Sequence, residues 1–329
     1  MNRALITGIF GQDGSYLAEL LSRIGYEVHG INRADASDHS LRLRAHLANK
    51  GIEPIIHACN LCDYAEVRSL LETLQPTECY HLAAVHYSSE VLLSEQLRRD
   101  RTLFEQNTLS TLNLLCAIQE VTPGSRFVMA GSCLMYDSCE TSPQDGTEPF
   151  CSKSLYGLSK IAASQLTQYF RETHGLHAST AILYNHESPR RRPYFVTRKI
   201  VRGLVNVKRG QLPYLELGNL HSVKDWGYAR DYVHGMWLMA QADTPGSHVL
   251  ATGCGRTIDD FVRETADALG IKDVHEVIRV QQGLTRPPEQ IPLIGNPSRA
   301  YSELGWTHSV SFRQLVELMV DNEVQQTLD

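Results

Sequence analysis

The sequence has no apolar run of the roughly 18 residues that a membrane-spanning helix requires. It also has no excess of basic residues, because 31 Lys and Arg are outnumbered by 37 Asp and Glu, which gives a formal charge of -6. Such a balance does not favour nucleic acid, whose phosphates attract clustered Lys and Arg. We therefore expect no membrane or nucleic-acid partner, and an anionic ligand must be met by local positive charge.

Internal repeats and low-complexity tracts are absent too, and the 8 cysteines form no metal-binding pattern. Cys59-x-x-Cys62 has no second pair of Cys or His at the spacing of a zinc site. We expect reduced thiols and no metal. The apolar run at residues 4–7 is too short for a signal peptide, so a cytoplasmic location is expected.

A glycine-rich turn follows this apolar run and precedes a helical pattern of apolar residues. The turn carries Gly8, Gly11 and Gly14 in the spacing G-x-x-G-x-x-G, with Gln12 and Asp13 before the last glycine. Strand, glycine turn and helix in this order are typical of dinucleotide binding, because glycine lets the backbone approach a diphosphate at a helix N-terminus. We expect these five residues to contact a cofactor; the alternative is a turn without a ligand.

Strand-like runs alternate with helical patterns through the first half of the chain, which predicts an α/β fold with a Rossmann-type, doubly wound parallel sheet. Strands are expected at residues 3–7, 27–31, 55–57, 78–82, 126–130, 178–183 and 246–252. We predict a cofactor-binding domain over residues 1–184, with segments returning around 231–253. Prolines break the alternation afterwards, so residues 185–329 are expected to form mainly a smaller, partly discontinuous substrate-binding domain.

The end of the second predicted strand distinguishes NADP from NAD. Asn32 is neutral and Arg33 is basic, which favours the 2′-phosphate of NADP, whereas Asp35 nearby leaves NAD as the alternative. Four residues at other strand ends are expected to line the cofactor: Asn60, Leu61, Ala83 and Ala84.

Tyr156 and Lys160 lie four residues apart at the start of a helical pattern, so they share one helix face. The Lys160 ammonium would then lower the pKa of the Tyr156 phenol, which could exchange a proton while hydride moves to a nicotinamide. Ser132, in the loop after the strand at 126–130, is the expected third catalytic residue. The structural alternatives are a solvated helix face for the pair and an ordinary turn for the serine.

Several long stretches distinguish this sequence from other dinucleotide-binding chains. They are residues 6–17, 183–191, 195–200, 217–219, 224–233, 286–289 and 304–306. Together they resemble the GDP-mannose 4,6-dehydratase family of extended short-chain dehydrogenases, over nearly the whole chain. The resemblance implies a tightly held NADP, contacted also by Tyr156, Lys160 and His186, and a GDP-sugar bound between the two domains.

Nine residues are expected to face the nucleotide sugar, where a diphosphate favours Lys and Arg and a guanine or ribose edge favours a carboxylate. They are His86, Asn185, Glu187, Arg191, Lys199, Gly218, Lys224, Arg286 and Glu289. The alternative for the charged ones is an ordinary surface ion pair.

One position departs from the family pattern. In the family's reaction, Tyr takes the C4 hydroxyl proton as hydride leaves, a Glu removes the C5 proton as water leaves C6, and hydride then returns to C6. The family's loop reads like Thr-x-Glu where this chain has Ser132, Cys133 and Leu134. Because an alkyl chain transfers no proton, elimination requires a substitute base. The nearest candidates in the sequence are Cys133, Glu140 and His86.

Three functions follow. The first is an NAD(P)-dependent C4 oxidoreductase or epimerase that acts on a GDP-sugar without efficient dehydration. The second is a 4,6-dehydratase with a replacement base, and the third is a non-catalytic protein that binds NADP or a nucleotide sugar. Residues 37–49 could be a solvated face or a loop that reaches a neighbouring subunit, and we expect a homodimer or homotetramer.

Overall fold

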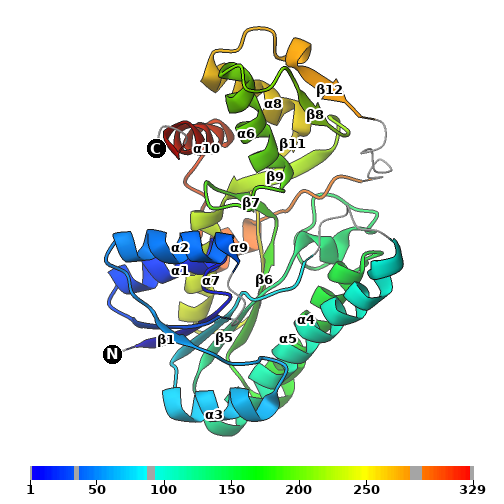
Figure 1. The fold of residues 1–329 in the computed structure, drawn as a ribbon. Coiled ribbons are helices and arrows are strands. Elements are labelled where there is room, and N and C mark those ends of the chain that lie inside the picture. Colours follow the sequence, from blue (N-terminus) through cyan, green and yellow to red (C-terminus); the bar gives the residue numbers. More distant parts are fainter. Residues whose placement is uncertain (1, 33–36, 87–92, 282–290, 327–329) are drawn as a thin grey trace.

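The computed structural model describes residues 2–32, 37–86, 93–281 and 291–326. The expected Rossmann-type sheet is confirmed: seven strands lie in the order β10-β6-β5-β4-β1-β2-β3, and neighbouring strands pair in parallel (Figure 1). Their bounds are β1 (Arg3–Thr7), β2 (Glu27–Ile31), β3 (Ile55–His57), β4 (Glu78–His81), β5 (Arg126–Ala130), β6 (Ala178–Leu183) and β10 (Ser247–Leu250). Within these ranges, no helix is both long and apolar enough to cross a membrane.

Helices cover both faces of this sheet. Successive side chains of a strand point to opposite faces, so a strand with apolar residues throughout needs helices on both sides. Phe127 and Met129 of β5 pack in one apolar cluster with α3 (Tyr64–Leu74), α4 (Leu93–Val121) and α5 (Leu155–His174). Val128 and Ala130 pack in a second cluster on the other face. That cluster includes α1 (Gln12–Arg23), α2 (Asp38–Asn49), α7 (Ala229–Gln241) and α9 (Ser298–Leu304).

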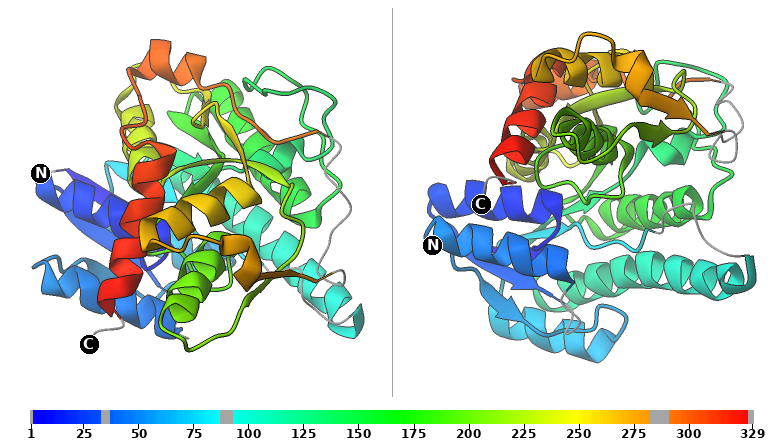
Figure 2. Two further views of the ribbon diagram at one scale, coloured as in Figure 1. Left: turned by 90° about the horizontal axis from the view of Figure 1, so that it is seen from above. Right: turned by 45° about the horizontal axis from the view of Figure 1, so that its top comes forward.

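A third apolar cluster lies in the part of the molecule above the sheet (Figure 2). It holds α6 (Val196–Lys208), α8 (Ile258–Leu269) and α10 (Phe312–Gln326), around the stacked or edge-on rings of Trp226, Phe261 and Phe312. Its strands are β7 (Asn185–Glu187), β9 (Val223–Tyr228) and β11 (Gly255–Thr257), with a separate pair β8 (Leu215–Leu217) and β12 (Ile278–Val280). The division at residue 184 stays a prediction.

The polar segment 37–49 forms a helix, so the expectation of a loop is wrong, whereas the nature of its exposed face, solvated or in contact with a neighbouring subunit, stays a prediction. Ser37 Oγ caps α2 by accepting the Ser40 backbone N–H at 3.3 Å. Leu43 and Leu47, one turn apart, are buried, while Arg42 and Arg44 are exposed. The two leucines supply the apolar stripe that fixes the helix on the domain.

Candidate active site

The glycine turn between β1 and α1 has no room for side chains. Gly8 has φ +71°, and a Cβ on it would lie 3.0 Å from the Ala83 backbone. A Cβ on Gly14 would lie 2.6 Å from the Ile9 Cα. The Gly11 N–H donates to the Gly8 carbonyl at 2.8 Å, which closes the turn. A ligand can therefore approach the main chain of this loop directly.

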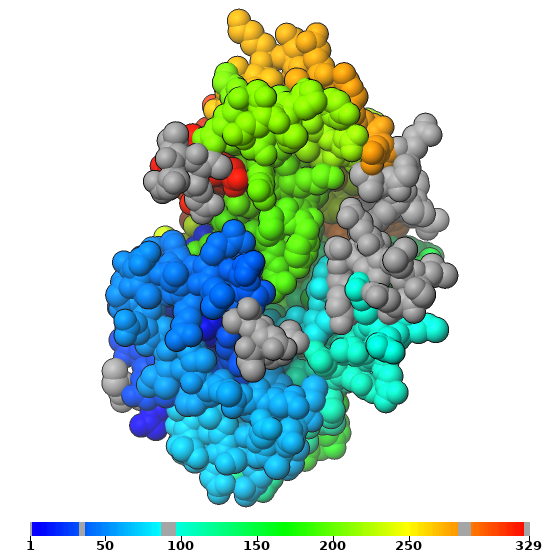
Figure 3. Space-filling view, in the orientation of Figure 1, coloured from blue at the N-terminus to red at the C-terminus, as the bar shows by residue number. Residues whose placement is uncertain are grey.

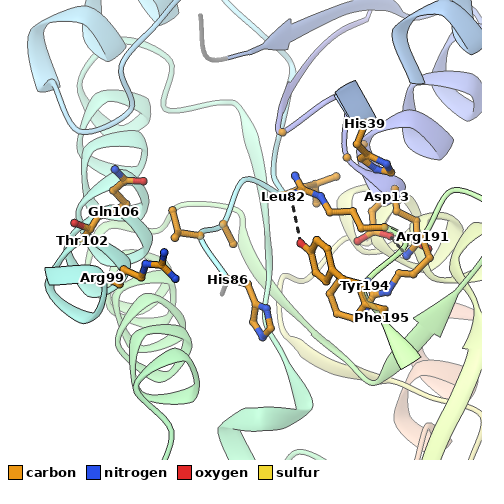
Figure 4. A pocket seen from close by; sticks show the side chains of 17 residues that line it. Asp13, His39, Leu82, His86, Arg99, Thr102, Gln106, Arg191, Tyr194 and Phe195 are labelled. Atoms are coloured by element: carbon orange, nitrogen blue, oxygen red, sulfur yellow. Dashed lines mark hydrogen bonds between the residues drawn. The ribbon is translucent and has the colours of Figure 1, made fainter. Parts of the chain in front are cut away.

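Two cavities with volumes of about 570 and 470 Å³ lie along this loop and share some of its residues in their walls. The larger one lies between the loop, the end of β4, one face of α4 and the segment after β7 (Figure 4). The surface between the blue, green and cyan segments is hollowed (Figure 3). The predicted cofactor residues that line one or both cavities are Gly8, Gly11, Gln12, Asp13, Gly14, Asn60, Leu61, Ala83 and Ala84.

The three predicted catalytic residues lie where β5 ends and α5 begins. Ser154 caps α5, and the buried Lys160 donates from Nζ to the Ala130 carbonyl at 2.9 Å. The same Nζ lies 5.8 Å from the centre of the Tyr156 ring. Ser132 caps the short helix η1 (Cys133–Tyr136), with its Oγ accepting the Leu134 N–H at 3.2 Å. None of the three is among the residues that line the two cavities.

The lowered pKa expected for Tyr156 is not found, because the net shift of its pKa is upward. Burial raises the pKa of Tyr156, Cys133 raises it further, and Arg191 opposes the change only in part. Burial also lowers the pKa of Lys160 to about 8. The Lys160 ammonium donates a hydrogen bond to the Ala130 carbonyl, and the helical spacing of Tyr156 and Lys160 does not predict this contact. Tyr156 is a neutral phenol at pH 7 in this protein.

His86 places a second titratable ring beside Tyr156. The two rings meet edge to face with centroids 4.7 Å apart, and His86 also stacks with Phe195 at 6.1 Å. Its side chain is exposed and lines the larger cavity (Figure 4). On the same wall, the Arg191 guanidinium lies 3.6 Å from the centre of the Phe195 ring and 3.3 Å from the Glu187 carboxylate.

The glycine loop is tied to β7 by polar side chains. Gln12 Nε2 donates to the His186 carbonyl at 3.0 Å, and Ser188 Oγ donates to Gln12 Oε1 at 2.8 Å. His186 Nδ1 lies 2.7 Å from the Tyr184 carbonyl, and Nε2 lies 3.0 Å from Asp13 Oδ2. Since the carbonyl and the carboxylate only accept, both imidazole nitrogens carry protons. His186 therefore contacts the loop rather than either cavity.

In this pair, each partner reverses the effect that burial has on the pKa of the other. Burial would lower the pKa of His186, but the Asp13 charge and hydrogen bond raise it overall. Burial would raise the pKa of Asp13, but His186 lowers it overall. Each partner thus favours the charged form of the other.

Of the described residues that were predicted to bind substrate, His86 and Arg191 line the larger cavity, and the others line neither cavity. Glu187 is buried and accepts the Thr197 hydroxyl at 2.6 Å, in addition to its pairing with Arg191. Asn185 lies on β7, Lys199 on α6, Gly218 after β8 and Lys224 on β9. Arg33, Arg286 and Glu289 lie outside the described residues.

Sequence reasoning missed one wall of the larger cavity. Arg99, Thr102 and Gln106 of α4 line it on the side opposite His39 (Figure 4). The three α4 residues are spaced i, i+3 and i+7, which places them on one helix face. This spacing is the feature of the sequence from which a shared polar face of α4 could have been predicted. Which face of α4 would meet the glycine loop depends on packing that spacing does not contain.

Comparison with known proteins gives a family and a fold. A family model described as GDP-mannose 4,6 dehydratase matches residues 5–319. The chain is 40% identical to GDP-mannose 4,6 dehydratase 2 of Arabidopsis thaliana, over 98% of this chain and 87% of the relative. It is 36% identical to GDP-mannose 4,6-dehydratase of Vibrio cholerae serotype O1, over 98% and 94%.

Solved structures with the same fold include RMD from Pseudomonas aeruginosa complexed with NADPH, with a TM-score of 0.81 and 20% identity over 99% of this chain and 100% of that one. The dTDP-glucose 4,6-dehydratase from Bacillus anthracis in complex with NAD gives a TM-score of 0.82 and 17% identity, over 99% and 97%.

Proposed function

Because this chain belongs to the GDP-mannose 4,6-dehydratase family, we propose that it is an NADP-dependent enzyme that transfers hydride at C4 of GDP-mannose or a related GDP-sugar without efficient loss of water. The family makes it a short-chain dehydrogenase of the sugar epimerase/dehydratase type. The net product would be an epimer, a 4-keto sugar or a reduced sugar.

The residues present fit a dinucleotide. The glycine turn excludes side chains at its closest approach, and the two cavities that meet over it extend toward the ends of β2 and β3. Asn32, Ser37, Ser40 and Arg192 line the end near β2, and no carboxylate is among the described residues there. Hydroxyl, amide and guanidinium donors suit a phosphate, which supports NADP over NAD.

Each expected catalytic residue has a distinct role in this proposal. The cofactor, when bound, supplies the hydride acceptor. Tyr156 removes the C4 hydroxyl proton, Ser132 hydrogen-bonds the C4 oxygen, and the Lys160 ammonium stabilises the tyrosinate that forms. Because the pKa of Tyr156 is raised in the protein alone, bound ligands must supply the missing positive charge near its oxygen.

The observation that carries the proposal is that the described part of the chain offers no unpaired carboxylate beside Tyr156. Leu134 stands where the family resemblance places a Glu, and its side chain packs against the apolar cluster on the α1 side of the sheet. Asp13 is the one acid among the described residues that line the two cavities, and it is paired with His186. Among the described residues, no carboxylate is therefore free to take the C5 proton that elimination requires.

Restoring the acid tests the proposal. We expect Leu134→Glu to gain loss of water from GDP-mannose relative to wild type, whereas Leu134→Met, which keeps an apolar side chain, does not. Efficient water loss by the wild-type protein, or equal behaviour of the two variants, would argue against it.

A second candidate function is 4,6-dehydration with His86 as the replacement base. The contact of His86 with Tyr156 favours it, and so do the names of the relatives. Cys133 is buried and Glu140 is exposed, and neither lines a cavity. This candidate requires that His86→Gln abolish water loss while cofactor reduction continues.

We also propose a homo-oligomer. Arg190 is buried between Ser15 and Glu19, so it does not reach a neighbouring subunit, and the exposed Arg42 and Arg44 of α2 are better placed to do so. Sedimentation of the purified chain distinguishes dimer, tetramer and monomer.

A further inference from the structure

Two cysteines lie side by side close to the expected catalytic residues. Cys139 follows η1 and Cys151 precedes α5. The Ser138 N–H donates to the Cys151 carbonyl at 3.0 Å, and the Cys151 N–H donates to the Met135 carbonyl at 2.9 Å. These two bonds hold the segment that leaves η1 against the segment that enters α5.

The two thiols are on adjacent backbone and are accessible. Cys139 Sγ donates to the Pro149 carbonyl at 3.4 Å, two residues before Cys151. Cys151 is exposed and Cys139 partly exposed, whereas Cys59, Cys79 and Cys133 are buried. Burial raises the pKa of Cys139, and the neighbouring Cys151 thiol raises it further. An oxidant would therefore meet Cys151 first, and Cys139 is the neighbour that can displace it.

We propose that Cys139 and Cys151 form a reversible intramolecular disulfide on exposure to glutathione disulfide. The Cys151 thiolate attacks one sulfur of glutathione disulfide and releases one glutathione thiolate. The Cys139 thiolate then attacks Cys151 Sγ and releases the second. The two protons lost by the cysteines pass to the two glutathione thiolates, so the protein loses two hydrogen atoms and glutathione disulfide is reduced.

The bond would fasten the two ends of the loop 140–150 to each other. Ser132 caps η1 at one end of this region, and Tyr156 lies on the first turn of α5 at the other. The Leu134 carbonyl and the Ser152 side chain already lie against Gly157 of α5. The disulfide therefore restrains the loop that holds Ser132 and Leu134 relative to the helix that holds Tyr156.

The sequence offers a direct test by peptide mapping. Trypsin leaves residues 127–153 as one peptide, since no Lys or Arg lies between Arg126 and Lys153. Cleavage before Asp137 and Asp145 separates Cys133, Cys139 and Cys151 into three peptides. After treatment of the whole protein with glutathione disulfide, we expect residues 137–144 and 145–153 to appear as one linked species within a single chain. Dithiothreitol should separate them.

Three variants make the result decisive. Cys139→Ser and Cys151→Ser should each abolish the linked species, and Cys254→Ser, at an exposed cysteine elsewhere, should leave it unchanged. Melting of the reduced variants at the wild-type temperature shows that they are folded. In the oxidised wild type, amide exchange over residues 140–150 should be slower than in the reduced protein. A link through Cys133, a link between two chains, or glutathione adducts without a link would each overturn the proposal.

Discussion

Asp13 and His186 are 173 residues apart in the sequence, yet Asp13 Oδ2 and His186 Nε2 lie 3.0 Å apart in the protein. The contact joins the first turn of α1 to β7, and Asp13 itself lines the larger cavity. The His186 ring also stacks on Tyr232 of α7, with centroids 5.0 Å apart. The ion pair therefore fixes the glycine loop against elements that come from the other half of the chain.

This pair makes stability depend on pH in a defined direction. The folded pKa of His186 is raised, so its stabilisation is complete below the unfolded value of about 6.5 and is lost as pH rises through the folded value. The folded pKa of Asp13 is lowered, so its stabilisation is present above about pH 3.9 and is lost as pH falls. The pair stabilises most between about pH 4 and 6.5.

Urea unfolding across pH 5–9 checks this expectation, with the pH range set by the two pKa directions. His186→Gln should lower the unfolding free energy by about 3 kcal/mol near pH 5.5, because it leaves a buried carboxylate without its partner. The difference from wild type should shrink as pH rises. His221→Gln, at an exposed histidine, is the control and should leave the dependence of stability on pH as in the wild type. A difference independent of pH would mean that His186 is not an imidazolium.

Tyr156→Phe should reduce hydride transfer at C4 by about 10²–10⁴-fold, because it removes the proton acceptor and leaves the ring contact with His86. Reduction of NADP by GDP-mannose, followed by absorbance in a single turnover, measures this step. Tyr169→Phe, at an exposed tyrosine of the same helix, should match wild type. If Tyr156→Phe retains full function, the protein is a non-catalytic binder of NADP or a nucleotide sugar.

Arg99→Ala should weaken NADPH binding by about 10- to 100-fold, since one charge-assisted hydrogen bond is worth about 1.5–3 kcal/mol. The reason is that Arg99 lies on the α4 wall of the larger cavity, across from the glycine loop. Arg98→Ala, at the adjacent exposed arginine, should leave the affinity unchanged. Titration of each variant with NADPH by fluorescence gives the two constants. Equal losses in both variants would point to the overall charge of α4 instead.

Gly14→Ala should destabilise the protein by more than about 2 kcal/mol and weaken NADPH binding, because the new Cβ would overlap the Ile9 backbone. Gly124→Ala is the matched change, since nothing lies within 4 Å of a Cβ at that position. Thermal melting with and without NADPH separates the loss of stability from the loss of affinity. A wild-type response of Gly14→Ala to NADPH would show that the loop does not hold the cofactor.

Features set by local pattern could be predicted from the sequence. The bounds expected for strands β1, β2, β3, β5 and β6 agree with the structure to the residue. Each is a short segment between turn residues, so its limits follow from the residues next to it in the sequence. The start of α5 next to Tyr156 follows from the Ser154 cap for the same reason.

Features set by packing could not be predicted. The sequence does not show that His186 meets Asp13, because neither residue lies in a pattern that refers to the other. Spacing put Lys160 beside Tyr156 but did not reveal that burial raises the pKa of the phenol or that the ammonium is bound to the Ala130 carbonyl. The polar surface of α2 likewise concealed the buried pair Leu43 and Leu47.

The central claim is hydride transfer at C4 without efficient elimination, and the product formed from GDP-mannose tests it most directly. The wild-type protein would be incubated with NADP and GDP-mannose labelled with deuterium at C4, and the products resolved by mass spectrometry. We expect the label to pass from C4 to the cofactor, where it stays if a 4-keto sugar is released and from which it returns to C4 in an epimer, with the oxygen at C6 retained. Accumulation of a 6-deoxy-4-keto sugar nucleotide, formed by loss of water with the label carried to C6, would contradict the account.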